Sequence, residues 1–233
     1  MKILEVYGMR RSGHHAFIGW LKHNFDSKYG RPNVHYINDL YNNHSVKGET
    51  LEWKIQELAS IPTNELLIVS YEDVFTNESR LENYEKEKIV FIRDIYNMAA
   101  SRYQASKHGA MRIDETFIKR WIDQCNFPFK FRYEDFLQNK ESRDLLCQHF
   151  DIPNLDILND VNYCSNIGSS FIGRKHDTIE NYLNRYQMVE LPENIVTLIT
   201  SEEVQEVRQK LGYSVAYFRV LIKHSFSGCF PDK

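Results

Sequence analysis

The chain has 233 residues, of which 42% are hydrophobic and 26% charged, so it can bury a substantial core and is not intrinsically disordered. Its formal net charge of -3 creates no overall field that would attract nucleic acid, so any anion site must be local. The sequence has no signal peptide at its start, no apolar run long enough for a membrane span, and 4 scattered cysteines. These features predict a cytoplasmic protein with reduced thiols that binds neither membrane nor nucleic acid.

Strand patterns alternate with helix patterns along the chain. The strand patterns cover residues 3–7, 65–71, 88–93 and 129–133, and the helix patterns cover residues 14–24, 94–109, 134–150, 178–187 and 201–211. Continuous apolar strands separated by helices predict a three-layer α/β/α fold with a central, mainly parallel sheet. We expect residues 1–233 to form a single domain, with the mostly helical residues 156–233 packed on it.

A glycine-containing loop, Gly8-Met9-Arg10-Arg11-Ser12-Gly13, joins the first predicted strand to the first predicted helix. This G-x-x-x-x-G spacing and context are those of a P-loop-like phosphate site, in which backbone N–H groups and the positive end of the helix dipole face an anion. Nucleotide triphosphatases continue with Lys and then Ser or Thr, whereas this chain has His14 and His15. Neither offers the oxygen ligand that magnesium prefers, so we expect the loop to hold an anion without a metal.

Residues Arg11-Ser12-Gly13 resemble the Lys/Arg-Ser-Gly-Thr-Thr loop of the sulfotransferases that use 3′-phosphoadenylyl sulfate (PAPS). In that family the loop holds the 5′-phosphosulfate of PAPS, on a fold related to the nucleotide kinases but independent of magnesium. The resemblance implies that Arg10, Arg11, Ser12 and Gly13 bind the donor. His14 and His15 stand where the family has two threonines.

A second segment, from Arg93 to Ser101, is similar to the family signature in which an Arg at a strand end and a Ser eight residues later bind the nucleotide 3′-phosphate. Arg offers a planar fork of donors, and a helix brings the hydroxyl back to the same side two turns later. The family proline is Ile95 here, and its second acidic position is Asn97.

Two shorter matches follow downstream. Tyr133, in Tyr133-Glu134-Asp135, matches a family tyrosine near the adenine, although an ordinary strand end explains it equally well. Arg174 and Lys175, after Gly173, resemble the basic segment that closes over the 3′-phosphate, although a solvated basic turn is an equal alternative.

The resemblance implies a metal-independent sulfotransferase that moves a sulfuryl group from PAPS to a hydroxyl or amine of a small-molecule or saccharide acceptor, leaving adenosine 3′,5′-bisphosphate (PAP). Arg11 would stabilise the leaving phosphate, and His14 or His15 would contact the sulfuryl group or move a proton. Glu72 is the first candidate for the general base and Asp73 the second, although either can instead cap the next segment. His108 is a weaker candidate.

Two other functions remain open at this point. A metal-dependent nucleotide kinase on the same fold would show ATP turnover with magnesium. A non-catalytic nucleotide-binding module would bind PAP and transfer nothing.

Overall fold

The computed structural model describes residues 2–29, 34–38, 65–73, 85–106, 112–155 and 179–213. Within these residues the centre of the molecule is a five-stranded sheet in the order β2-β3-β1-β4-β5, and every neighbouring pair is parallel. The strands are β1 (Lys2–Gly8), β2 (Val34–Asn38), β3 (Leu66–Glu72), β4 (Lys86–Ile92) and β5 (Lys130–Arg132).

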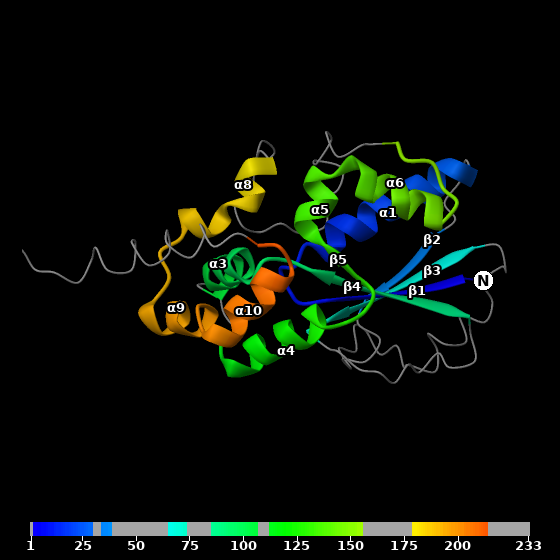
Figure 1. Ribbon diagram of the computed structural model, residues 1–233. Coiled ribbons are helices and arrows are strands. Elements are labelled where there is room, and N and C mark those ends of the chain that lie inside the picture. Colours follow the sequence, from blue (N-terminus) through cyan, green and yellow to red (C-terminus); the bar gives the residue numbers. More distant parts are fainter. Residues whose placement is uncertain are drawn as a thin grey trace, which may run out of the picture.

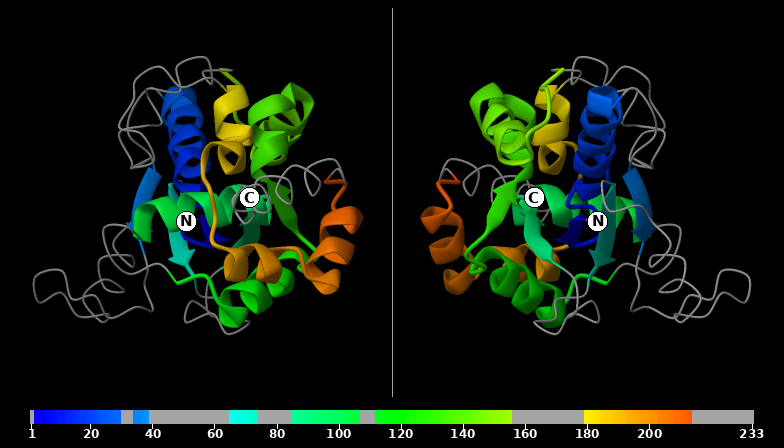
Figure 2. Two further views of the ribbon diagram at one scale, coloured as in Figure 1. Left: turned by 90° about the vertical axis from the view of Figure 1, so that its left-hand side faces the viewer. Right: turned by 90° about the vertical axis from the view of Figure 1, so that its right-hand side faces the viewer.

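Helices cover both faces of this sheet, as Figure 1 shows, and the views at right angles agree (Figure 2). One face carries α1 (His14–Tyr29), α5 (Tyr133–Gln138), α6 (Lys140–His149) and α8 (Ile179–Leu183). The other face carries α3 (Ile95–Ser106), α4 (Glu115–Cys125), the short 3-10 helix η2 (Arg185–Met188), α9 (Glu193–Ile199) and α10 (Glu202–Lys210). The predicted three-layer α/β/α fold is therefore confirmed.

The two cores follow from the alternation of side chains along the central strand. Leu4 and Val6 of β1 pack under α1, whereas Ile3 and Tyr7 pack under α3 and α4. Among the residues described, no helix combines the length and apolar character needed to cross a bilayer. Cys125 and Cys147 are free and buried.

Several elements differ from the sequence predictions. Strand β2 and helices α4 and α9 were not predicted, and the helix expected over residues 134–150 is broken into α5 and α6. The break is at Asn139, whose side-chain oxygen accepts a hydrogen bond from Ser142 N at 3.2 Å and so caps α6. Strand β2 lies at the sheet edge and has only 5 residues, with neither a continuous apolar run nor a regular alternation of polar and apolar residues, so its pattern is short and weak.

The strand register brings the predicted motifs together at the carboxyl ends of the strands. Gly8, the last residue of β1, pairs with Glu72 on one side and Phe91 on the other, and Ile92 pairs with Arg132. These residues all lie at or next to the carboxyl ends of parallel strands. Open α/β folds bind their ligands at this end of the sheet.

Candidate functional site

The glycine loop forms a curved backbone at the start of α1. Arg11 and Gly13 both have positive φ, of 75° and 90°, and alternate with residues of ordinary conformation. Such alternation turns successive N–H groups toward one side, which makes an anion-binding concavity. His14 and His15 are the first residues of α1, so their backbone N–H groups have no acceptor within the helix.

The loop also carries a guanidinium with one unsatisfied nitrogen. Arg11 Nε is buried and has no hydrogen-bond partner among the described residues. Burial lowers the pKa of Arg11, while the nearby Glu72 carboxylate opposes this effect. A buried guanidinium N–H without an acceptor, beside a concavity of backbone N–H groups, fits a bound phosphate or sulfate.

Gly13 provides a test of the loop geometry. A Cβ added at Gly13 would lie 2.4 Å from Cε2 of the Tyr133 ring, at a φ of +90°. We expect Gly13→Ala to lower the free energy of unfolding by about 2–5 kcal/mol, because left-handed strain and overpacking add. Urea unfolding measures this loss.

Gly212 is the matched control, since its φ is +76° but an added Cβ would approach only Arg132 Nη1, at 3.6 Å. Gly212→Ala should therefore cost only the conformational part, about 1–2 kcal/mol. Equal losses of unfolding free energy in the two variants would show that the ring of Tyr133 does not pack against Gly13.

Two histidines converge on Glu72. His15 Nε2 lies 2.5 Å from Glu72 Oε1, and His14 Nε2 lies 3.4 Å from the same oxygen. The other ring nitrogens are also held, because His14 Nδ1 lies 3.0 Å from Ser12 Oγ and His15 Nδ1 lies 3.1 Å from the hydroxyl of Tyr36. The sheet register explains the meeting, since Glu72 pairs with Gly8 at the start of the loop.

The surroundings shift the pKa values of His14 and Glu72. Burial lowers the pKa of His14, which therefore stays neutral at physiological pH. Burial raises the pKa of Glu72, but the interactions with His14 and His15 outweigh it and hold that pKa well below its usual range. Glu72 is thus a carboxylate at neutral pH, suited to hold a proton donor in place.

Asp73 holds the loop through hydrogen bonds to its backbone. Its carboxylate accepts a hydrogen bond from Arg10 N at 3.0 Å and pairs with the Arg102 guanidinium, and Arg102 Nε donates to Arg10 O at 3.2 Å. Asp73 N also donates to Gly8 O at 3.1 Å. These contacts suit a residue that positions the loop.

Arg93 comes from the end of β4 and reaches the same loop. Its Nη1 donates to Arg11 O at 3.1 Å, across 82 positions of sequence, and its guanidinium carbon lies 4.6 Å from the centre of the Tyr133 ring. Trp121 of α4 donates its indole N–H to Arg93 O at 2.9 Å. The two predicted anion motifs, and the predicted aromatic residue, therefore meet.

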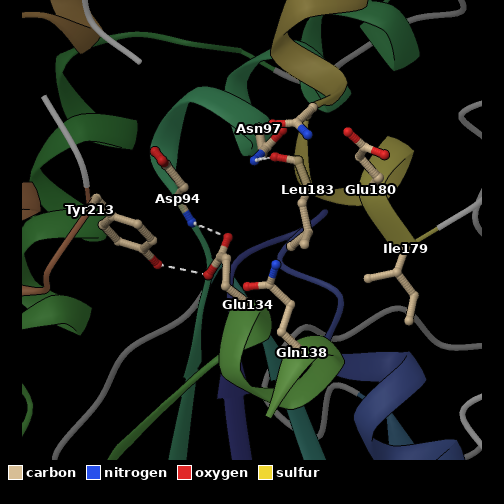
Figure 3. A pocket seen from close by; sticks show the side chains of 9 residues that line it. Asp94, Asn97, Glu134, Gln138, Ile179, Glu180, Leu183 and Tyr213 are labelled. Atoms are coloured by element: carbon tan, nitrogen blue, oxygen red, sulfur yellow. Dashed lines mark hydrogen bonds between the residues drawn. The ribbon is translucent and has the colours of Figure 1, made fainter. Parts of the chain in front are cut away.

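The residue after Arg93 ties the site to the carboxyl-terminal helices. Asp94 pairs with Arg208 of α10 at 2.9 Å, and its N–H donates to Glu134 at 3.0 Å. The hydroxyl of Tyr213 donates to the other oxygen of Glu134 at 2.8 Å (Figure 3). Burial and the Asp94 charge raise the pKa of Glu134.

One pocket adjoins Asp94 and Glu134, and a second borders the loop. The one in Figure 3 has a volume of about 440 Å³ and is lined by three acidic residues, Asp94, Glu134 and Glu180, together with amide and apolar side chains. The second, of about 450 Å³, is lined by the loop residue Met9 and by charged and apolar side chains that include Asp73, Arg102, Arg112, Asp114 and Arg120.

Most of the predicted site residues lie together at this edge of the sheet. They are Arg10, Arg11, Ser12, Gly13, His14, His15, Glu72, Asp73, Arg93 and Tyr133. Ser101 is buried on α3, and the contact with the loop comes from its neighbour Arg102. His108, Arg174 and Lys175 lie outside the described residues.

Sequence reasoning did not predict three contributors: Tyr36, Arg102 and Trp121. The helix that carries Trp121 could have been predicted, because Asp114 is a typical N-cap residue at the start of an amphipathic stretch. In the structure Asp114 accepts a hydrogen bond from Phe117 N, as such a cap does. Tyr36 and Arg102 carry no local signal, because their partners are remote in sequence: Tyr36 contacts His15 on α1, and Arg102 contacts Arg10 and Asp73.

Comparisons with known proteins found no matching family model and no matching curated protein. Among solved structures, mouse sulfotransferase SULT7A1, complexed with PAP, aligns at 10% identity over 96% of this chain and 89% of that one, with a TM-score of 0.49.

Proposed function

We propose that this protein is a metal-independent sulfotransferase that transfers a sulfuryl group from PAPS to a hydroxyl or amine acceptor. The observation that carries the proposal is the contact between Arg93 and Arg11, because it joins the two segments that resemble donor-binding motifs of that family. The concavity at residues 8–13 and the unsatisfied Nε of Arg11 fit an anionic donor. A cytoplasmic location is part of the same proposal.

In the proposed reaction the bond between sulfur and the bridging phosphate oxygen breaks as a bond forms from sulfur to the acceptor oxygen or nitrogen. Negative charge then builds on the leaving phosphate, where Arg11 and the N–H groups at the start of α1 stabilise it. Arg93 binds the same donor from the side of β4.

The acceptor's proton passes, in this proposal, to the pair formed by His15 and Glu72. Glu72 holds His15 Nε2–H, which leaves Nδ1 as the basic nitrogen and stabilises the imidazolium that forms. Tyr36 lies 3.1 Å from Nδ1 and orients the ring. Glu72 thus acts through His15, and Asp73 positions the loop.

The pocket beside Asp73 is the proposed acceptor site, because it borders the loop through Met9. It contains three arginines against two aspartates, Asp73 and Asp114. This balance favours an acceptor that carries an acidic group near the hydroxyl or amine to be sulfated. The rates of transfer to an acidic acceptor and to a neutral form of the same acceptor test this preference.

Thermal melting with PAP in the presence of EDTA tests the donor site. At about 100 times its Kd, PAP should raise Tm by about 5 to 10 °C. An unchanged Tm at millimolar PAP contradicts the proposal, and ATP turnover that needs magnesium would favour the kinase instead. Binding of PAP without release of PAP from PAPS, across a panel of acceptors, would indicate a non-catalytic module.

A further inference from the structure

We propose that His14, His15 and Glu72 also form a binding site for a divalent transition-metal ion of the zinc class. Each residue offers one ligand atom, and these three atoms lie within 4.8 Å of one another. Two imidazoles and a carboxylate are a donor set that suits zinc and its neighbours and does not suit magnesium. The histidines that remove the usual magnesium ligand from this loop therefore supply a different kind of metal site.

One of the distances between ligand atoms already matches a tetrahedral centre. Bonds of about 2.0–2.1 Å from zinc to its ligands place neighbouring ligand atoms about 3.3 Å apart. His14 Nε2 and Glu72 Oε1 are already 3.4 Å apart. His15 Nε2 and Glu72 Oε1 are at hydrogen-bond distance, 2.5 Å, and need to separate by slightly less than 1 Å as the ion replaces the shared proton.

His14 provides an independent sign that a ligand belongs here. Its side chain is 1% exposed, and its Nε2 lies 3.4 Å from Glu72 Oε1 but makes no hydrogen bond of good geometry among the described residues. A buried ring nitrogen that is so poorly paired costs free energy, and a bound ion would remove this cost.

Outer contacts already orient both rings for this role. Metal-binding histidines usually donate their second ring N–H to a neighbouring oxygen. Here His14 Nδ1 lies 3.0 Å from Ser12 Oγ, and His15 Nδ1 lies 3.1 Å from the hydroxyl of Tyr36. When each Nδ1–H donates a hydrogen bond to its oxygen, both Nε2 atoms are available to bind the ion.

The surroundings leave the ion accessible and moderately favoured. The side chains of His15 and Glu72 are 26% and 16% exposed, so a fourth ligand can enter from solvent or from the loop. Asp73 adds a second negative charge nearby, whereas Arg10, whose Nε lies 3.4 Å from Glu72 Oε2, opposes the ion. The site should therefore bind zinc reversibly and should not hold it permanently.

An ion bound at this site would prevent the proposed proton transfer to His15. The base needs the proton on His15 Nε2, whereas the metal needs it on Nδ1, so the two uses require opposite tautomers of the same ring. If the proposed function holds, a bound ion inhibits transfer. The metal site itself is tested without nucleotide or acceptor, so its success or failure is separate from that of the sulfotransferase reaction.

Titration of the full chain with Zn²⁺, and with Co²⁺ followed by visible absorption, tests the site. We expect one equivalent to bind, with the absorption of four- or five-coordinate cobalt. His15→Gln and Glu72→Gln should each weaken binding by more than about 100-fold, and Tyr36→Phe, which removes an outer contact, by about tenfold. His149→Ala is the matched control, because His149 pairs with Glu87 at 2.6 Å and the two form no cluster of three metal-binding side chains within the described part of the chain.

Two results would overturn the metal site. One is a folded wild-type protein that binds neither ion at micromolar concentration. The other is binding that survives in His15→Gln and Glu72→Gln, which would place the ion elsewhere. Circular dichroism of each variant establishes that it is folded, and binding of PAP in EDTA reports separately on the donor site.

Discussion

Replacing Arg93 with alanine should weaken PAP binding by about 100-fold, because loss of one partner from a buried charged contact costs about 2–5 kcal/mol. Arg93 is 2% exposed, so its charge acts where water screens it poorly. It also holds the loop through Arg11 O, so the substitution removes both a donor contact and a loop contact. Isothermal titration of PAP in EDTA measures the effect.

The control for Arg93→Ala is Arg143→Ala. Arg143 is similarly buried, at 6% exposed, and its Nη1 donates to Phe136 O at 2.9 Å, on the opposite side of the sheet from α3. Both variants should lose stability, but only Arg93→Ala should lose PAP. If the two variants bind PAP equally well at a temperature where both are folded, Arg93 does not contact the donor.

Replacing His15 with glutamine should slow sulfuryl transfer by about 10²- to 10⁴-fold while leaving the Kd for PAP nearly unchanged. The change removes the proposed base but keeps the backbone N–H at the start of α1. Release of PAP from PAPS, with water or an added alcohol or amine as acceptor, gives the rate. Glu72→Gln should show a smaller loss of the same kind, because it weakens the stabilisation of the imidazolium.

The matched control is His35→Gln, since His35 on β2 pairs with Glu65 but touches no part of the loop among the contacts described. Its rate should equal that of the wild type. A His15→Gln rate equal to the wild-type rate would move the base to another residue, and a large loss of PAP affinity would assign His15 to donor binding.

The local features of the site were predictable from short segments. The G-x-x-x-x-G spacing between a strand pattern and a helix pattern depends on neighbouring residues only, and β1, the loop and α1 are found where they were expected. Arg93 at the end of an apolar strand is predictable for the same reason. Turn chemistry and hydrophobic period are properties of a few consecutive residues, so sequence alone determined these elements.

The convergence of the side chains was decided by the tertiary structure. His15 meets Glu72 across 57 positions, and Arg102 meets Arg10 across 92, because the strand register and the docking of α3 bring them together. Nothing in the local pattern distinguishes His14 and His15 as a pair that shares one carboxylate oxygen. Strand pairing and helix packing set such distances, and both depend on contacts between segments that are remote in the chain.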